Sequence, residues 1–406
     1  MPNTEQNKAQ KCVAITGMGI ISAIGNTLEE NKKSLLSSTS GIGDLLYIKS
    51  KQASKIKVGE VKLSNADFIA QLRLPTENNF TRTALLGLVA AKEAIANSKI
   101  TKIEEFRTGF ISATSVGGMD KTEIYFKDFQ TKPSSQKHIA SHHAGDSTQK
   151  IADALGINGF VTTVSTACSS AANAIMMGAR LIKAGKLDRV IVGGTDALSK
   201  FTINGFKTLM ILSDEACSPF DANRKGLNLG EAAAYLVLES EAIVNLQNKK
   251  VVAYLTGYGN ANDAFHQTAS SETGEGAYLA MQKALKVANL QPSKIDYINA
   301  HGTATSNNDL SESVAINRIF GHNVPDFSST KAFTGHTLAA AGAIEAVFSV
   351  IALHEQTLFP NLHFQTKIPE TGLQPITKLR QQNIEHVLSN SFGFGGNCST
   401  LIFSEA

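Results

Sequence analysis

Residues 161–180, VTTVSTACSSAANAIMMGAR, constrain the fold more than any other stretch of the chain. The valines and threonines at 161–164 favour a β-strand, because branched side chains fit a pleated surface. Residues 171–182 are largely apolar on all sides, which is typical of a helix inside a protein. The stretch therefore predicts a strand, a tight turn and a buried helix, which is an α/β arrangement.

Cys168 lies at the junction between this strand and this helix. A thiol there meets the unpaired N–H groups and the positive end of the helix, which favour its thiolate. That effect is worth about 1 kcal/mol, so it lowers the thiol pKa only slightly and most of the group stays protonated at neutral pH. A working nucleophile therefore needs a second activator, usually a histidine. A buried core cysteine is the alternative and is more frequent by residue type alone, but the position at the turn favours the nucleophile.

Length and composition set the outer limits. The 406 residues, 42% of them hydrophobic, can bury a large core as one big domain or two fused halves. The 38 basic and 35 acidic residues nearly balance, so nothing points to nucleic acid as the main partner, and no membrane span is expected. The cysteines show no paired spacing and follow no signal peptide, which favours a reducing, cytoplasmic compartment. The polar residues 1–10 predict a flexible tail.

The chain repeats its own pattern near residue 250. VVAYLTGYGN resembles KCVAITGMGI near the start, and STKAFTGHTLAAAGAIEA echoes STACSSAANAI. The echoes predict two related halves, residues 11–250 with the cysteine and residues 251–406 with two histidines. If the halves are equivalent, Cys168 and His336 begin two paired buried helices. Gly-x-Gly in the first half hints at a dinucleotide site, but Ser22 replaces the third glycine, so GMGIISAIG predicts a tight turn.

Two histidines lie at predicted element ends, beside glycines. His301 follows the predicted strand 295–299, and His336 precedes the apolar helix 337–353. A lone histidine is more often structural. Two of them with Cys168 at a third such turn favour a catalytic site, because the strand ends of α/β folds collect reactive groups.

Other polar residues fall close to these histidines. Glu345 interrupts the apolar helix and needs a cation, for which Lys331 is the candidate. Thr303 and Thr305 point the same way in an extended chain and offer hydroxyls to an extended polar ligand. The glycine-rich motif NSFGFGGNC can present backbone N–H groups to an oxyanion, with Phe394 as a gate, or can form a tight hairpin with aromatic staples.

A cluster of histidines in HIASHH raises the question of a metal. His138 and His142 have the i, i+4 spacing of metal ligands, and His143 follows them. No cysteine or glutamate nearby completes a site. The cluster therefore predicts solvated or interface histidines, and no metal site is expected.

Taken together, these motifs resemble the β-ketoacyl-acyl-carrier-protein synthases, the condensing enzymes of fatty-acid and polyketide synthesis. The resemblance runs from VAITGMGIIS to NSFGFGG and rests on STACSSAANAI, NAHGTAT, STKAFTGH and the Phe394 motif. It implies a thiolase-like duplicated α/β fold, with two similar halves in five layers, α-β-α-β-α, usually as a homodimer. It also implies decarboxylative Claisen condensation of an acyl-enzyme thioester with malonyl-acyl-carrier protein.

By this resemblance Cys168 is the acyl-accepting nucleophile, and His301 with His336 is the decarboxylation pair. The residue chemistry fits these roles. Acyl transfer needs a thiolate and an oxyanion hole, for which the N–H groups of Cys168 and Phe394 are the expected donors. Decarboxylation leaves an enolate, which two neutral imidazoles stabilise by donating N–H, at about 3 kcal/mol for each well-placed donor.

The resemblance assigns supporting roles as well. Lys331 and Glu345 tune and orient the site, while Thr303 and Thr305 contact the phosphopantetheine arm. No cofactor on the enzyme is expected, because the substrates ride on the phosphopantetheine of an acidic acyl-carrier protein. The second chain of the dimer is identical or is a related ketosynthase-like subunit. A basic docking patch is expected around the entrance, with the candidates Lys62, Lys121, Lys127 and Lys207.

The sequence also departs from the family pattern. The last motif reads GFGGNC where GFGGTN is commonest, Ser306 replaces a usual proline, and GLNLGEAAA carries alanines in place of glycines. The context of STACSSAANAI is closer to specialised pigment or polyene synthases than to housekeeping elongation enzymes. The acyl chain length and the pathway stay open.

Three other classes of protein compete with this interpretation. A non-catalytic chain-length-factor-like subunit shares the fold but lacks the nucleophile, which Cys168 supplies. A thiolase-type acyl-CoA acyltransferase uses a second reactive cysteine, and Cys398 is near the right place, although it falls on a predicted strand. In a binding module without chemistry, Cys168 would react with thiol reagents no faster than Cys12.

Overall fold

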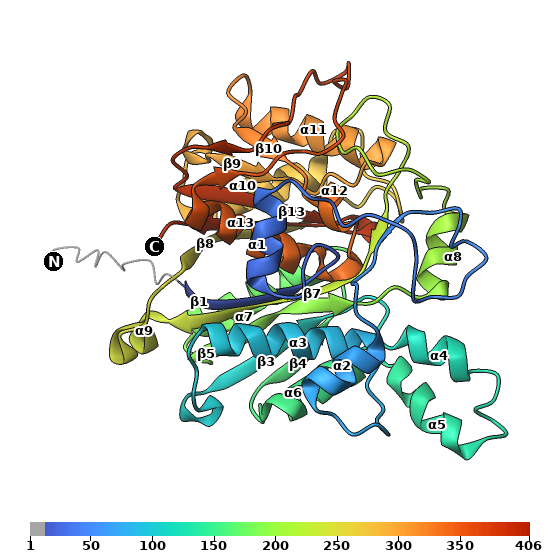
Figure 1. The fold of residues 1–406 in the computed structure, drawn as a ribbon. Coiled ribbons are helices and arrows are strands. Elements are labelled where there is room, and N and C mark those ends of the chain that lie inside the picture. The colour runs from blue at the N-terminus through green and yellow to red at the C-terminus, as the bar shows by residue number, and fades with distance from the viewer. Residues whose placement is uncertain (1–12) are drawn as a thin grey trace.

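The computed structural model describes residues 13–406. Its helices and sheets are stacked in layers (Figure 1). The predicted tail at 1–10 and Cys12 lie outside these residues. Ten strands form one ladder in the order β10-β9-β13-β14-β8-β1-β7-β5-β3-β4. One half consists of β1 (Val13–Ile21), β7 (Ala232–Ser240), β5 (Arg189–Asp196), β3 (Thr108–Ala113) and β4 (Val161–Val164). The other consists of β8 (Ala253–Asn262), β14 (Asn397–Ser404), β13 (His386–Phe392), β9 (Tyr297–Asn299) and β10 (Asp326–Ser328).

The two halves of the ladder have the same pairing pattern. From the middle of the sheet outward, the strands of one half are β1-β7-β5-β3-β4 and those of the other are β8-β14-β13-β9-β10. In each half two antiparallel pairings are followed by two parallel ones. Within residues 13–406, the strands of the two half-sheets pair with each other only where β1 meets β8, in a short antiparallel pairing. This repetition is the duplicated α/β fold that the sequence predicted.

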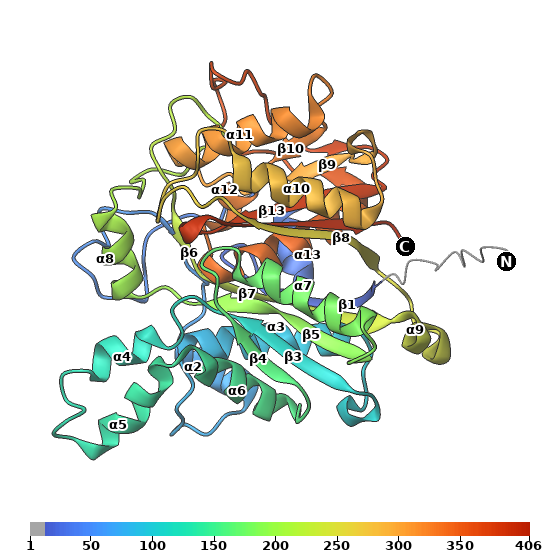
Figure 2. The ribbon, with the colours of Figure 1, turned by 180° about the vertical axis from the view of Figure 1, so that it is seen from behind.

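Helices complete the five layers (Figures 1 and 2). Helices α7 (Ser170–Lys183) and α13 (Ala341–Glu355) pack on each other between the two half-sheets. Cys168 precedes α7 in the chain and His336 precedes α13, as predicted. Helix α3 (Arg82–Asn97) covers one outer face, and α10 (Glu275–Ala288) with α11 (Ser306–Phe320) covers the other. The predicted order α-β-α-β-α is confirmed.

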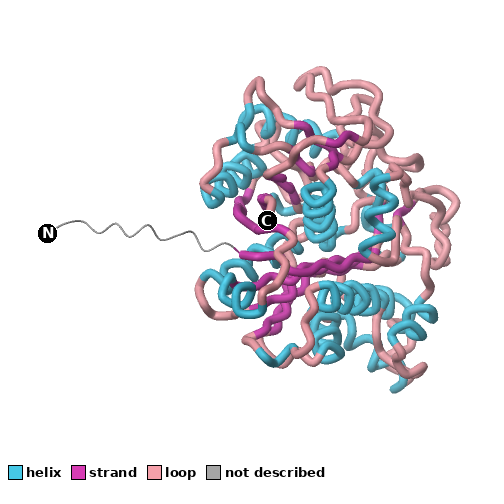
Figure 3. Tube along the Cα trace, turned by 60° about the vertical axis from the view of Figure 1, so that its left-hand side comes forward, coloured by secondary structure: helices cyan, strands magenta, loops and turns pink. Residues whose placement is uncertain are grey.

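Shorter elements surround these layers, and Figure 3 shows how much of the chain around them is loop. The remaining helices are α1 (Leu28–Leu36), α2 (Asn65–Leu72), α4 (Met119–Tyr125), α5 (Pro133–Ile139), α6 (Ala144–Leu155), α8 (Lys200–Thr208), α9 (Glu241–Gln247) and α12 (Lys331–Thr334). Two small sheets pair β2 (Val58–Gly59) with β6 (Leu229–Gly230), and β11 (Thr357–Leu358) with β12 (Arg380–Gln381).

Helix α13 and the turn before it form the most apolar stretch. Within residues 13–406, Leu338–Glu355 is the one segment with the length and hydropathy of a membrane-crossing helix. It is 89% buried inside the protein. Packing between two half-sheets therefore accounts for its composition, as it does for a core helix that is apolar all round.

The motif GMGIISAIG forms the predicted tight turn only in its second part, where Ser22 and Gly25 exchange backbone hydrogen bonds of 2.9 and 3.2 Å. Its first glycines lie within β1, where a Cβ on Gly19 would come 2.1 Å from the carbonyl oxygen of Ala90 in α3. A Cβ on Gly259 of β8 would come equally close, 2.1 Å, to the carbonyl oxygen of Ala280 in α10. These glycines let a helix lie directly on the strand. The same close packing occurs in both halves, which matches the predicted echo between TGMG and TGYG.

Candidate active site

One cavity of about 250 Å³ gathers the predicted site residues from both halves of the chain. Cys168 comes from the start of α7, whereas the histidines come from the second half. Lys331 and Glu345 are buried behind the cavity. The predicted residues that line it are Cys168, His301, Thr303, Thr305, His336 and Phe394.

The turn before α7 presents the thiol of Cys168. Ala167 has a φ of +52°, in the left-handed region that non-glycine residues rarely adopt, and this bends the chain sharply out of β4. The residues of the Phe394 loop, 393–397, lie against the turn. The backbone N–H of Phe394 donates a hydrogen bond to the thiol of Cys168. This N–H is one of the two donors expected for an oxyanion hole.

Burial raises the pKa of Cys168 to about 12, against the smaller lowering effects of the Lys331 charge and the Phe394 N–H. The thiol pKa was expected to fall slightly, whereas it is raised, and the expectation that the thiol is mostly protonated at neutral pH agrees with this. Removing a thiolate from water costs more free energy than the positive helix end returns. The resting group is a thiol, which must lose its proton during acyl transfer.

Lys331 holds His301 in one tautomer. The Nζ atom of Lys331 lies 3.2 Å from Nδ1 of His301 and also donates to the carbonyl oxygen of His301. An ammonium group only donates, so Nδ1 is the acceptor and a neutral ring carries its proton on Nε2. Lys331 also forms a buried ion pair with Glu345, as the sequence predicted. Glu345 accepts a further hydrogen bond, 3.2 Å long, from the hydroxyl of Ser391.

The two histidine rings meet edge to face. Their centroids are 5.4 Å apart and their planes cross at 88°. Burial, with the charge of Lys331 adding to it, holds the pKa of His301 and of His336 well below the ordinary histidine range. Among the described residues, Nδ1 of His336 has no hydrogen-bond partner. Both rings are therefore neutral at pH 7 and can each donate one N–H, as enolate stabilisation requires.

A second buried carboxylate supports the His301 turn, and the sequence reasoning missed it. Glu312 accepts hydrogen bonds from the backbone N–H groups of His301 and Gly302, at 2.9 and 2.8 Å, and from the amide of Asn390 at 3.1 Å. Burial raises the pKa of Glu312 to about 7. The local sequence SNNDLSES reads as an exposed polar turn, so it gives no sign of this burial.

The entrance is formed by a threonine pair and an aromatic pair. The hydroxyls of Thr303 and Thr305 lie 2.9 Å apart, so they point the same way as predicted. The ring of Phe394 stacks on Phe206 of α8, with centroids 5.9 Å apart. Strands β13 and β14 pair across the Phe394 loop, so the hairpin alternative also describes the backbone. The contact with Phe206 was not predicted.

Two other groups of residues take no part in this arrangement. His138, His142 and His143 each bond a different partner, and within residues 13–406 no cluster of three His, Cys, Asp or Glu side chains is arranged for a metal. Cys398 lies in β14 and lines the cavity, but burial raises its pKa as well. A thiolase-type second cysteine would need an activator there.

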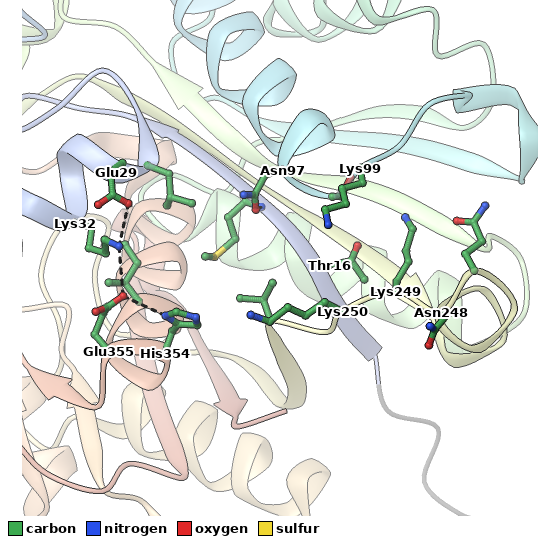
Figure 4. A pocket seen from close by; sticks show the side chains of 16 residues that line it. Thr16, Glu29, Lys32, Asn97, Lys99, Asn248, Lys249, Lys250, His354 and Glu355 are labelled. Atoms are coloured by element: carbon green, nitrogen blue, oxygen red, sulfur yellow. Dashed lines mark hydrogen bonds and ion pairs between the residues drawn. The ribbon is translucent and has the colours of Figure 1, made fainter.

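A larger hollow of about 650 Å³, drawn in Figure 4, shares no described lining residue with this cavity. Two of the four lysines that line it form ion pairs. Lys32 lies 2.9 Å from Glu29 and 3.5 Å from Glu355, and Lys249 bonds the buried Glu239 at 2.8 Å. None of the described residues that line it is a cysteine. The hollow therefore lacks the thiol that the catalytic cavity holds.

Comparison with known proteins gives matches over nearly the whole chain. Residues 10–242 match the family model "Beta-ketoacyl synthase, N-terminal domain", and residues 252–365 match "Beta-ketoacyl synthase, C-terminal domain". The 3-oxoacyl-[acyl-carrier-protein] synthase 2 of Staphylococcus aureus is 34% identical and covers 97% of this chain and 98% of its own. The solved ishigamide ketosynthase/chain length factor is 27% identical, with a TM-score of 0.92, over 98% of this chain and 100% of its own. A ketosynthase in complex with its chain length factor from Xenorhabdus doucetiae is 32% identical, with a TM-score of 0.84, over 100% of both chains.

Proposed function

The chain belongs to the β-ketoacyl synthase family, and we propose that Cys168, His301 and His336 divide the two half-reactions of its condensation between them. The protein is a condensing acyltransferase. The observation that supports the division is the single cavity that these three side chains line, with the Phe394 N–H on the thiol.

In the first half-reaction Cys168 accepts the acyl group. Its sulfur forms a bond to the thioester carbonyl, the bond to the carrier sulfur breaks, and the thiol proton ends on the released carrier thiol. The N–H groups of Cys168 and Phe394 stabilise the oxyanion of the tetrahedral intermediate. Because the resting thiol is protonated, proton loss accompanies the attack, with a neutral imidazole of the cavity as the nearby base.

In the second half-reaction the malonyl thioester loses carbon dioxide. The electron pair of the broken C–C bond becomes an enolate, whose oxygen receives N–H from His301 and His336. The enolate carbon then attacks the acyl-cysteine carbonyl, the bond to the Cys168 sulfur breaks, and the released thiolate takes a proton from solvent. The 3-oxoacyl product stays on its carrier. Both rings must be neutral for this step, and their lowered pKa values keep them so.

The partners follow from the relatives' names and from the edge of the sheet. The Staphylococcus aureus relative is named for an acyl-carrier protein, so we propose such a protein as the substrate carrier, with no cofactor on the enzyme itself. Strand β4 is the last strand of its half-sheet, and its unpaired edge suits pairing with a second chain. That chain is identical or is a related ketosynthase-like subunit. A cytoplasmic location and the pathway, fatty-acid or specialised polyene and polyketide, remain predictions.

Two variants test the division of labour. Cys168→Ala removes acyl transfer and leaves both imidazole donors, so malonyl decarboxylation should continue without condensation. His336→Ala should still load acyl groups, though more slowly if His336 is the base, while carbon dioxide release falls by about 10²- to 10³-fold, the usual loss for one such donor. Radiolabelled acyl transfer and carbon dioxide release are measured in parallel. Loss of both activities together in a folded Cys168→Ala protein would refute the division.

The competing classes are separated by substrate. A thiolase would act on acetyl-CoA alone, whereas the proposed enzyme needs malonyl-carrier protein. A chain-length-factor-like subunit would not load acyl groups at all. Mass spectrometry of the products formed from malonyl-carrier protein and a series of acyl primers would identify the reaction and the preferred chain length.

A further inference from the structure

One side chain at the start of β14 connects the Phe394 loop to helix α7. The Oδ1 atom of Asn397 accepts hydrogen bonds from the amides of Asn173, at 2.8 Å, and Asn260, at 2.9 Å. The hydroxyl of Ser169, the residue after the nucleophile, lies 2.7 Å from the same oxygen. Because both amides present N–H groups, the atom that faces them must be an acceptor.

The same residue closes the loop and reaches the turn that carries the nucleophile. The backbone carbonyl of Asn397 accepts a 2.8 Å hydrogen bond from the N–H of Gly393. The amide of Asn173 that bonds Asn397 also donates to the hydroxyl of Thr166, at 2.9 Å. Thr166 stands two residues before Cys168. A continuous chain of hydrogen bonds therefore runs from one backbone to the other.

These two backbones are in close contact. A Cβ on Gly393 would lie 2.8 Å from the carbonyl oxygen of Thr166 and 3.1 Å from the nitrogen of Cys168. The N–H of Phe394 reaches the thiol across this contact. A donor of an oxyanion hole loses its effect when it shifts, and a displacement of about 1 Å can reduce a rate about 100-fold. The spacing between loop and turn is thus critical for acyl transfer.

We propose that Asn397 is a positioning residue that sets the geometry between Cys168 and the Phe394 N–H. This inference rests on the proposed function and assigns it a further residue. It concerns a position where the sequence departs from the family, with GFGGNC in place of the commoner GFGGTN. The histidine pair lies on other elements, so Asn397 acts on acyl loading and not on decarboxylation.

Asn397→Val and Asn397→Thr form a matched pair, because valine and threonine have nearly the same shape and only threonine supplies an acceptor oxygen. Single-turnover loading of Cys168 should be about 10- to 100-fold slower in the valine variant, while the threonine variant recovers most of the wild-type rate. Carbon dioxide release, measured with each change in a Cys168→Ala background, should stay within about twofold of that parent, because no histidine has moved. Equal loading rates in the two variants, or a parallel loss of carbon dioxide release, would overturn the proposal.

Asn173→Ala keeps the test decisive if the valine variant fails to fold. Alanine favours the helix at this position but removes the amide that joins Asn397 to Thr166. Its loading rate should fall, though less than in Asn397→Val, because the Ser169 hydroxyl still joins Asn397 to the turn. Wild-type loading in Asn173→Ala would contradict the inference. A wild-type protein inactive in both assays would instead refute the proposed function, and this inference with it.

Discussion

Replacing Lys331 should make decarboxylation sensitive to acid. The ammonium of Lys331 lies 3.2 Å from Nδ1 of His301, and at an effective dielectric constant of about 20 two charges at that distance repel by about 5 kcal/mol. This repulsion opposes protonation of the ring and adds to the effect of burial, which is the larger cause of the lowered pKa. The neutral, N–H-donating form of His301 therefore persists in acid while Lys331 is present.

The variant must remove the charge without leaving its partner unpaired. Breaking a buried ion pair by removing one member costs about 3–5 kcal/mol, which alone could unfold the protein. The double variant Lys331→Met with Glu345→Gln keeps the site neutral and nearly the same size. It also removes the donor that makes Nδ1 of His301 an acceptor.

The assay is carbon dioxide release from malonyl-carrier protein between about pH 5 and pH 8.5, in a Cys168→Ala background, with urea unfolding as the check on stability. With Lys331 in place, the rate should stay level as the pH falls through about 6.5, the ordinary histidine range. Because the pKa of His301 rises in the double variant, its rate should begin to decline at a higher pH than that of its parent. A double variant whose profile stays as level as that of its parent would refute the role given to Lys331.

Three further predictions concern the thiol, the gate and the docking surface. Because burial raises the pKa of Cys168 to about 12, its alkylation by iodoacetamide should accelerate with each step in pH up to about 10, and a plateau near pH 8 would contradict the buried thiol. Phe394→Ala should weaken the preference between acyl and malonyl substrates, and Phe206→Ala should weaken it in part. The double variant should show no more than the effect of Phe394→Ala alone, and unchanged preferences would exclude a gate. Reversing the charge of two docking lysines should raise the apparent KM for carrier protein, more at low salt, and leave turnover of small thioester mimics nearly unchanged. An equal loss of activity on carrier protein and on the mimics would indicate a structural role for these lysines. The candidates are Lys62, Lys121, Lys127 and Lys207, of which Lys207 lies on α8 beside the entrance.

The parts of the fold that the sequence predicted are those specified by local signals. Strand β4 has the predicted bounds, and α7 (Ser170–Lys183) agrees with the predicted helix 171–182 to within one residue at each end. The pairing of Lys331 with Glu345 was also predictable, because a carboxylate in an apolar helix requires a cation. The cysteine and histidines that we propose as catalytic were recognisable because each stands at the end of an element.

What the sequence could not predict depends on contacts between distant parts of the chain. The raised pKa of Cys168 is the sum of groups from several elements of both halves, whereas the helix N-terminus is a local signal. The glycines of β1 are required by the close approach of α3, about 75 residues later in the chain. A rule that considers only neighbouring residues assigned them to a turn instead. The contacts of Glu312 and Asn397 have no sequence signal beyond the unusual GFGGNC.

The pairing of β1 with β7 also has a consequence for the growing chain on the ribosome. Thr16 and Glu239, which bond each other across this pair, are 223 residues apart. At a synthesis rate of about 5–20 residues per second, the apolar strand VAITGMGII waits roughly 10–45 seconds for its partner. An unpaired apolar strand is a template for aggregation. We therefore expect the nascent protein to depend on holding chaperones until residue 240 has left the exit tunnel.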